Sequence, residues 1–286
     1  MVKTERLSIT ISVVALGLAL SVLVPLPVRE LYFVVLGSEL TIHLSGAAQM
    51  AAIIVAIVCA GIESIIRLHP QAALRPISYT ATYWALPSIL TVASLILVQQ
   101  AEWWGHQVLM LAVGSTLIAL VVSLQYSSID SPGAERLPGG LGAIDLWQQP
   151  MARSALNAIG YGTALILFIT LYGTRARSVV SATSVMMASG LLSLGLLRGE
   201  RIHVGRTWLY AGILALIMGE LTWALNYAGL PLQVGGGFLL LTFYVLSSLI
   251  QQYLWKRLNR RVLAEYGTVY AVGVMSLVAI SVLTVR

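Results

Sequence analysis

Residues 235–285 read GGGFLLLTFYVLSSLIQQYLWKRLNRRVLAEYGTVYAVGVMSLVAISVLTV, two apolar runs on either side of the basic segment 256–261. A helix that crosses a bilayer needs about 20 mostly apolar residues, so each run is long enough to span. Clusters of Lys and Arg between spans favour the cytoplasmic side of a membrane. The stretch therefore predicts two membrane-spanning helices, 235–255 and 264–285, joined by a cytoplasmic turn.

The same pattern extends over the rest of the chain. Seven further apolar runs are long enough to span: 8–25, 47–66, 81–98, 106–125, 154–173, 179–197 and 207–226. With a cytoplasmic N-terminus, 13 of the 17 basic residues fall in gaps on the cytoplasmic side, which is the positive-inside bias. We expect an all-α polytopic membrane helix bundle of about nine transmembrane helices. Its C-terminus is predicted to be external, and the chain is expected to be a multi-pass protein of the plasma membrane.

The composition agrees with a chain surrounded by lipid. Hydrophobic residues make up 58% of it and charged residues only 10%, against about 25% charged residues in soluble domains. The net charge of +6 comes from residues at span ends that form no continuous face, which argues against nucleic-acid binding. We expect the partners to be the lipid bilayer and, at Lys256, Arg257, Arg260 and Arg261, its anionic headgroups.

The gaps between spans are short, so residues 1–286 are expected to form a single transmembrane domain. The longest connection, 126–153, is rich in Gly and Pro and predicts an irregular cytoplasmic loop between a four-span and a five-span half. The apolar core of 28–46 is too short to span, so this segment is interpreted as external and either interfacial or re-entrant. Residues 1–25 are interpreted as a retained first span, because their apolar run is longer than the core of a signal peptide; a cleaved signal is the alternative.

Small residues recur at helical spacing in two of the spans and stand in a row in a third. Ala48, Ala52, Ala56, Ala60 and Ser64 follow one another every fourth position in 47–66, and Ala211, Ala215 and Gly219 do so in 207–226. Small residues let helix backbones approach closely in lipid, so the helix over 47–66 is predicted to be central in the bundle. Gly235, Gly236 and Gly237 predict a break or a close contact where the span 235–255 begins.

Glu220 is the strongest candidate for a functional residue, because it lies about two turns inside the span 207–226. An acidic side chain within a span costs a few kcal/mol unless it is protonated, paired or hydrated. One interpretation is a substrate-, proton- or cation-binding site made with Trp223, Asn226, Ser189 and Ser193. The other is a structural carboxyl group that hydrogen-bonds a neighbouring helix.

Glu63 and Arg67 stand four residues apart at the predicted cytoplasmic end of the span 47–66, so they share a helix face and can form an ion pair. A structural anchor and a headgroup or substrate site are both open for this pair. His69 follows in the loop, with no second ligand at metal-binding spacing. The single cysteine, Cys59, excludes an intrachain disulfide or CxxC site. We therefore expect no metal and no cofactor.

Four segments carry a resemblance to a known family: GIESIIRLHP at 61–70, TYWALPS at 82–88, GELTWALNY at 219–227 and LNRRVLAEYG at 258–267. Together they resemble an uncharacterised family of bacterial multi-pass membrane proteins. The resemblance implies a bacterial inner-membrane protein and no particular reaction. The positions that match the family pattern are Glu63, Arg67, His69, Pro70, Trp84, Pro87, Glu220, Trp223, Asn226 and Glu265.

Two functions remain from the sequence. The first is a non-catalytic subunit or scaffold that binds other membrane subunits, indicated by short loops and by the lack of P-loop, HExxH, GxSxG and GxGxxG motifs in a suitable context. The alternative is a transporter or lipid-handling protein that uses Glu220 in a polar cavity. No pairing of a base with a nucleophile is visible, so we expect no enzyme activity.

Overall fold

The computed structural model describes residues 2–24, 26–35, 38–129, 142–174, 178–198 and 204–284. The chain divides into two compact units, Met1–Ser131 and Pro132–Arg286. The boundary falls within the predicted loop 126–153, at the place where the sequence divides into its two halves. A single transmembrane domain over 1–286 stays a prediction.

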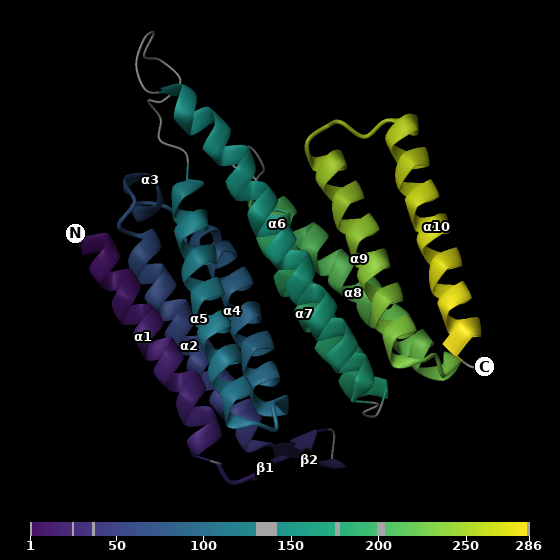
Figure 1. Ribbon diagram of the computed structural model, residues 1–286, viewed down its shortest axis with the longest axis horizontal. Helices are drawn as coiled ribbons and strands as arrows, with labels where there is room; N and C mark the ends of the chain where they lie inside the picture. Colours follow the sequence, from purple (N-terminus) through teal and green to yellow (C-terminus); the bar gives the residue numbers. More distant parts are fainter. Residues whose placement is uncertain are drawn as a thin grey trace. The chain divides into compact units, whose positions relative to one another are not determined.

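Each of the nine predicted spans corresponds to one long helix (Figure 1). These are α1 (Val2–Leu23), α2 (Gly46–Ile66), α4 (Ile77–Gln100), α5 (Trp104–Ser127), α6 (Gly142–Gly173), α7 (Ser178–Leu196), α8 (Val204–Ala228), α9 (Leu232–Leu254) and α10 (Arg260–Thr284). Eight of them are long and apolar enough to cross a membrane, and the apolar part of α7, Val180–Leu196, is shorter. The prediction of long apolar helices is therefore confirmed, eight of them long enough to span, and nine membrane crossings stay a prediction.

Residues that favour helix starts stand before several of these helices. Ser45 precedes α2, and its hydroxyl accepts a hydrogen bond from the backbone N–H of Ala48 at 3.2 Å, which satisfies one of the free donors of the first turn. Pro76 and Pro231 precede α4 and α9 in extended conformation. Helix α6 begins at Gly142, so it includes residues 142–153, which the sequence analysis assigned to the loop.

Unit 1 is a bundle of α1, α2, α4 and α5, with α4 the most buried of the four (Figure 1). Hydroxyl groups are buried along α4 because they donate to carbonyl oxygens of their own helix. Thr91 donates to Pro87 and Ser94 to Leu90, each at 2.8 Å. Ser94 also lies against Gly114 of α5, where the missing side chain allows the two helices to approach closely.

The prediction that the small residues of α2 mark a central packing face is wrong. Ala48, Ala52, Ala56 and Ala60 are exposed on unit 1. The buried face of α2 instead carries larger apolar residues, Ile54, Val58, Ile62, Ile65 and Ile66. The close approach that small residues permit occurs on another face, where Gly61 meets Thr10 of α1.

Residues 28–46 contain a β-hairpin that the all-α prediction did not include. Strands β1 (Arg29–Val35) and β2 (Ser38–Leu44) pair antiparallel, from Arg29 opposite Leu44 to Val35 opposite Ser38. The segment is rich in branched and aromatic residues that favour strands, and only residues 36 and 37 connect the two strands. The interfacial or re-entrant position of this segment stays a prediction.

Unit 2 consists of α6, α7, α8 and α9 packed together, with α10 against α9 (Figure 1). Small residues make its closest contacts: Gly219 of α8 lies against Met186 of α7, and Gly190 of α7 lies against Ala215 of α8. Gly235 and Gly236 of α9 lie against Tyr172 and Ile169 of α6, so the close contact predicted from this glycine run is present. None of the apolar window of α10 is buried.

Candidate functional site

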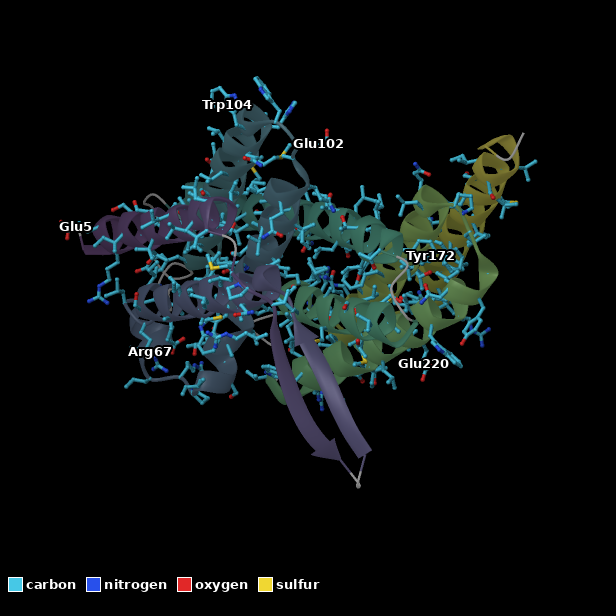
Figure 2. All side chains as sticks on the ribbon, turned by 90° about the horizontal axis from the view of Figure 1, so that it is seen from below. Glu5, Arg67, Glu102, Trp104, Tyr172 and Glu220 are labelled. Carbon is cyan, nitrogen blue, oxygen red and sulfur yellow. The ribbon has the colours of Figure 1, made fainter. Side chains whose placement is uncertain are left out.

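Glu220 lies inside α8 and on the outer surface of unit 2 (Figure 2). It is eight residues before Ala228, where α8 ends, which corresponds to about 12 Å along a helix. Its carboxylate forms no hydrogen bond or ion pair with the part of the chain that the structure describes. Trp223, one turn further, is 52% exposed, and its ring meets that of Tyr227 edge-on at 5.5 Å between centroids.

The other predicted partners of Glu220 lie elsewhere. The side-chain amide of Asn226 donates to Ser181 Oγ at 2.7 Å, which joins α8 to α7. Ser189 and Ser193 are buried, and their hydroxyls donate to carbonyl oxygens of their own helix, Met186 and Gly190. The structure therefore brings Glu220 and Trp223 together on one exposed face and does not bring Asn226, Ser189 and Ser193 to it.

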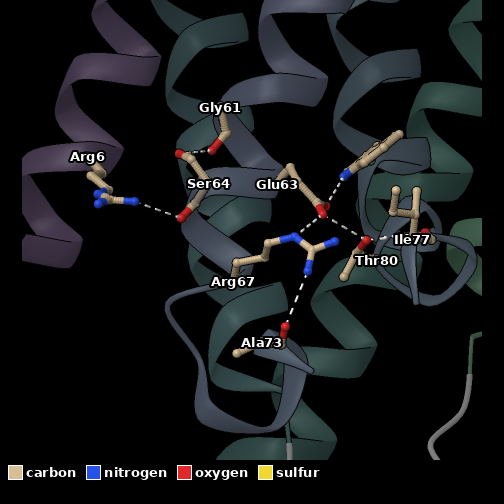
Figure 3. Close-up of polar contacts among 9 residues, drawn as sticks. Arg6, Gly61, Glu63, Ser64, Arg67, Ala73, Ile77 and Thr80 are labelled. Carbon is tan, nitrogen blue, oxygen red and sulfur yellow. Dashed lines mark hydrogen bonds and ion pairs between the residues drawn. The ribbon is translucent and has the colours of Figure 1, made fainter. Parts of the chain in front are cut away.

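The second predicted pair is part of a larger polar cluster in unit 1 (Figure 3). Arg67 Nε donates to Glu63 Oε1, so the expected ion pair is formed. Thr80 Oγ1 donates to the same oxygen at 3.1 Å, and Trp84 Nε1 donates to Glu63 Oε2 at 3.0 Å. Three side-chain donors, one from the residue after α2 and two from α4, thus converge on a carboxylate whose side chain is 20% exposed.

The same cluster orders the connection between α2 and α4, which includes the short helix α3 (Pro70–Ala73). Arg67 Nη1 donates to the carbonyl oxygen of Ala73 at 3.2 Å. His69 is buried, with its ring edge-on to Tyr126 of α5 at 5.4 Å. A carboxylate that already accepts three hydrogen bonds has little capacity left for a ligand. The choice between a structural anchor and a headgroup or substrate site stays a prediction.

Thr80 and Trp84 were not predicted as members of this cluster. No spacing rule relates them to Glu63, because they come from another helix. The one available signal was that Glu63, Arg67 and Trp84 all belong to segments that carry the family resemblance. Two of these segments, GIESIIRLHP and TYWALPS, meet here through the hydrogen bond between Trp84 and Glu63.

A cavity of about 360 Å³ lies at the other end of unit 1, which is predicted to be external. Its lining comes from the ends of α1, α2, α4 and α5 and from residues 24 and 26: Ser21, Val22, Val24, Leu26, Gly46, Ala47, Met50, Gln99 and Gln107. The side-chain amide of Gln107 donates to the carbonyl oxygen of Ala101 at 2.9 Å. Neither Glu220 nor the Glu63 cluster lines this cavity.

The basic segment after α9 is exposed. The guanidinium group of Arg257 lies 6.0 Å from the ring centroid of Trp255, and Arg261 pairs with Glu265 at 3.2 Å. Binding of anionic headgroups to Lys256, Arg257, Arg260 and Arg261 stays a prediction. Among the described residues, no group of three or more His, Cys, Asp or Glu is arranged to hold a metal ion.

Comparison with known families adds one finding. A family described as "Protein of unknown function (DUF5656)" matches residues 26–280. The chain belongs to this family. The DUF5656 match begins after α1 and extends through the Glu63 cluster and the exposed face of α8 into α10. It agrees with the resemblance to an uncharacterised family, whose bacterial origin stays a prediction. No curated protein and no solved structure matches the chain.

Proposed function

We propose that this protein is a non-catalytic subunit or scaffold of a complex in the bacterial inner membrane, with its N-terminus in the cytoplasm. The observation that carries the proposal is the position of Glu220, which is exposed on α8 within a helix long and apolar enough to span. A carboxylate on the surface of a spanning helix faces either hydrocarbon or protein.

Energy favours a protein neighbour. An acidic residue near the centre of a spanning helix costs about 2.5–3.5 kcal/mol on insertion scales. Pairing or hydrogen bonding at a protein interface offsets that cost, whereas lipid tails offer no donor. The nearby aromatic rings of Trp223 and Tyr227 are of types that are enriched at protein interfaces.

Transport or lipid handling through Glu220 receives less support. That function needs the carboxylate in a hydrated cavity, typically of about 300–1,000 Å³. The cavity of about 360 Å³ in unit 1 is lined by other residues. The hydroxyl groups of the buried serines Ser189 and Ser193 already donate to carbonyl oxygens of α7.

Purification from native membranes in a mild detergent or nanodiscs, followed by mass spectrometry of the bound components, tests the proposal. A protein partner that is retained in a constant ratio to the chain supports a subunit. A chain that purifies alone, with a bound lipid or small molecule, contradicts the proposal and favours the transporter or lipid-handling alternative.

A further inference from the structure

The exposed face of α8 carries a regular row of large side chains. The row consists of Leu209, Ile213, Leu216, Glu220, Trp223 and Tyr227, and the intervals between its members alternate between four and three residues. Its apolar and aromatic members are 43–72% exposed. We call this row the α8 seam.

Alternating intervals of four and three are the spacing with which one helix packs along another at a small crossing angle. A helix face in contact with lipid can have the same spacing, so the pattern alone does not distinguish the two. Glu220 distinguishes a protein-facing from a lipid-facing surface, because its charge is costly in hydrocarbon and its carboxylate has no partner among the described residues. The α8 seam is therefore more consistent with a protein neighbour than with lipid.

The chain does not supply a cation for Glu220 from its own spans. Every Lys, Arg or His inside the eight spanning windows lies within the first three residues of its window. These positions are close to the helix ends, whereas Glu220 is about 12 Å from the nearer end of α8. A second copy has the same sequence, and a parallel twofold pairing through this seam would place one Glu220 opposite another.

Trp223 adds a second feature that fits a cation. It follows Glu220 by three residues, so the two side chains are neighbours on the helix surface. The face of an indole ring attracts an ammonium or guanidinium group. A carboxylate beside an exposed indole is therefore a suitable site for the head of a Lys or Arg side chain.

We infer that the α8 seam binds a membrane-spanning helix of another protein, which places a Lys or Arg side chain against Glu220 and Trp223. The inference rests on the proposed function and specifies the partner as a hydrophobic helix with one basic residue inside the bilayer. That residue lies about 12 Å from the helix end on the same side of the membrane as Ala228, where α8 ends. Small or apolar residues are expected at its other contact positions.

Photo-crosslinking of the full chain in native membranes tests this inference. A photoreactive residue replaces Leu216, one turn before Glu220, and a matched control replaces Val272 of α10; the two positions are 55% and 52% exposed. We expect an adduct with another protein from position 216 and none from 272. The crosslinked peptide must come from a spanning segment that contains a Lys or Arg at the stated depth.

A charge test in the same cells follows. Glu220→Leu is expected to reduce the adduct about tenfold, the effect of losing one interhelical polar contact, and cannot disturb packing inside unit 2 because the side chain is exposed. Exchange of the charges, Glu220→Lys with the partner's basic residue replaced by Glu, is expected to restore the adduct.

Several results would overturn the inference. They are adducts within the chain itself, adducts with a second copy, adducts with lipid only, and a partner segment without a basic residue. If native purification still yields a partner in constant ratio, any of these crosslinking results would contradict only the assignment of the α8 seam as the binding face. The proposed subunit function would then remain supported. If purification yields no partner, the proposed function fails as well.

Discussion

The indole N–H of Trp84 in α4 donates a hydrogen bond of 3.0 Å to Glu63 in α2. Arg67 and Thr80 donate to the other oxygen of the same carboxylate. The last turn of α2 and the first two turns of α4 are thereby held together through one side chain. This arrangement gives separate predictions for the acceptor and for its donors.

Trp84→Phe removes one donor and keeps most of the ring volume. A hydrogen bond to a charged group contributes about 1.5–3 kcal/mol, so the substitution should lower the free energy of unfolding by about that amount. Thermal denaturation of the purified protein in detergent measures it. Trp104→Phe is the matched control, since Trp104 is 70% exposed, and an equal loss of stability in both variants would contradict the role assigned to Trp84.

Glu63→Leu should destabilise the protein more than Arg67→Leu. Without the carboxylate, Trp84 loses its acceptor, Thr80 keeps only the carbonyl oxygen of Ile77, and Arg67 keeps only that of Ala73. A polar group that is left buried and unpaired is costly. Without Arg67, Glu63 keeps two donors, and the lost ion pair is 37% exposed on the arginine side, so its loss should cost only about 1 kcal/mol. Comparing the melting temperatures of the two variants checks the order, and a larger loss in Arg67→Leu would refute it.

Gly236→Ala should destabilise the contact between α6 and α9. A Cβ at Gly236 would lie 2.9 Å from the Cα of Ile169, and because that neighbour is backbone, the helices must separate. We expect a loss of about 1–3 kcal/mol, which is typical of overpacking. Gly267→Ala in α10 is the control, because nothing lies within 4 Å of its added Cβ; it should be neutral or stabilising by up to about 1 kcal/mol.

The hydrogen bond between Asn226 and Ser181 should show coupling between α7 and α8. Asn226→Leu and Ser181→Ala each remove one end of the 2.7 Å contact. In a double-mutant cycle, the coupling free energy should be about 0.6–2 kcal/mol, the range for polar contacts between membrane helices. Additive effects of the two substitutions would mean that the contact contributes nothing to stability.

The exposed alanines of α2 give a test of its orientation. Ala56→Leu should leave the melting temperature of the protein within about 1 °C of the original, since an exposed substitution changes stability little. Ala211→Leu in α8 should lower it markedly, because Ala211 is buried and overpacking is costly. A large loss in Ala56→Leu would mean that this face of α2 is covered.

The positions of the helices could be predicted from the sequence because a spanning helix needs a long apolar run, and such runs are visible without any tertiary information. Predicted ends were less accurate where polar residues continue a helix. Helix α6 begins at Gly142, 12 residues before its predicted span, because the segment 142–153 carries no hydropathy signal. The hairpin at Arg29–Leu44 was missed because a short apolar run was compared only with the length of a span.

The candidate sites could be predicted only as far as single helices allow. The pairing of Glu63 with Arg67 follows from their spacing on one helix. The convergence of Trp84 on Glu63 depends on which faces of α2 and α4 meet, and helix periodicity does not choose the neighbour. The same limit explains why the small residues of α2 predicted a packing face that is in fact exposed. It also explains why Asn226 hydrogen-bonds Ser181 of α7 and does not form a site with Glu220.

Helix α10 is the last of the described helices to be synthesised, and none of its apolar window is buried. Its contacts with α9 are made by side chains such as Leu277 against Gly237 and Leu241 against Gly273. The four helices before it can therefore reach their mutual packing while α10 is still being translated. We therefore expect α10 to join a bundle in which the four earlier helices of unit 2 already pack together.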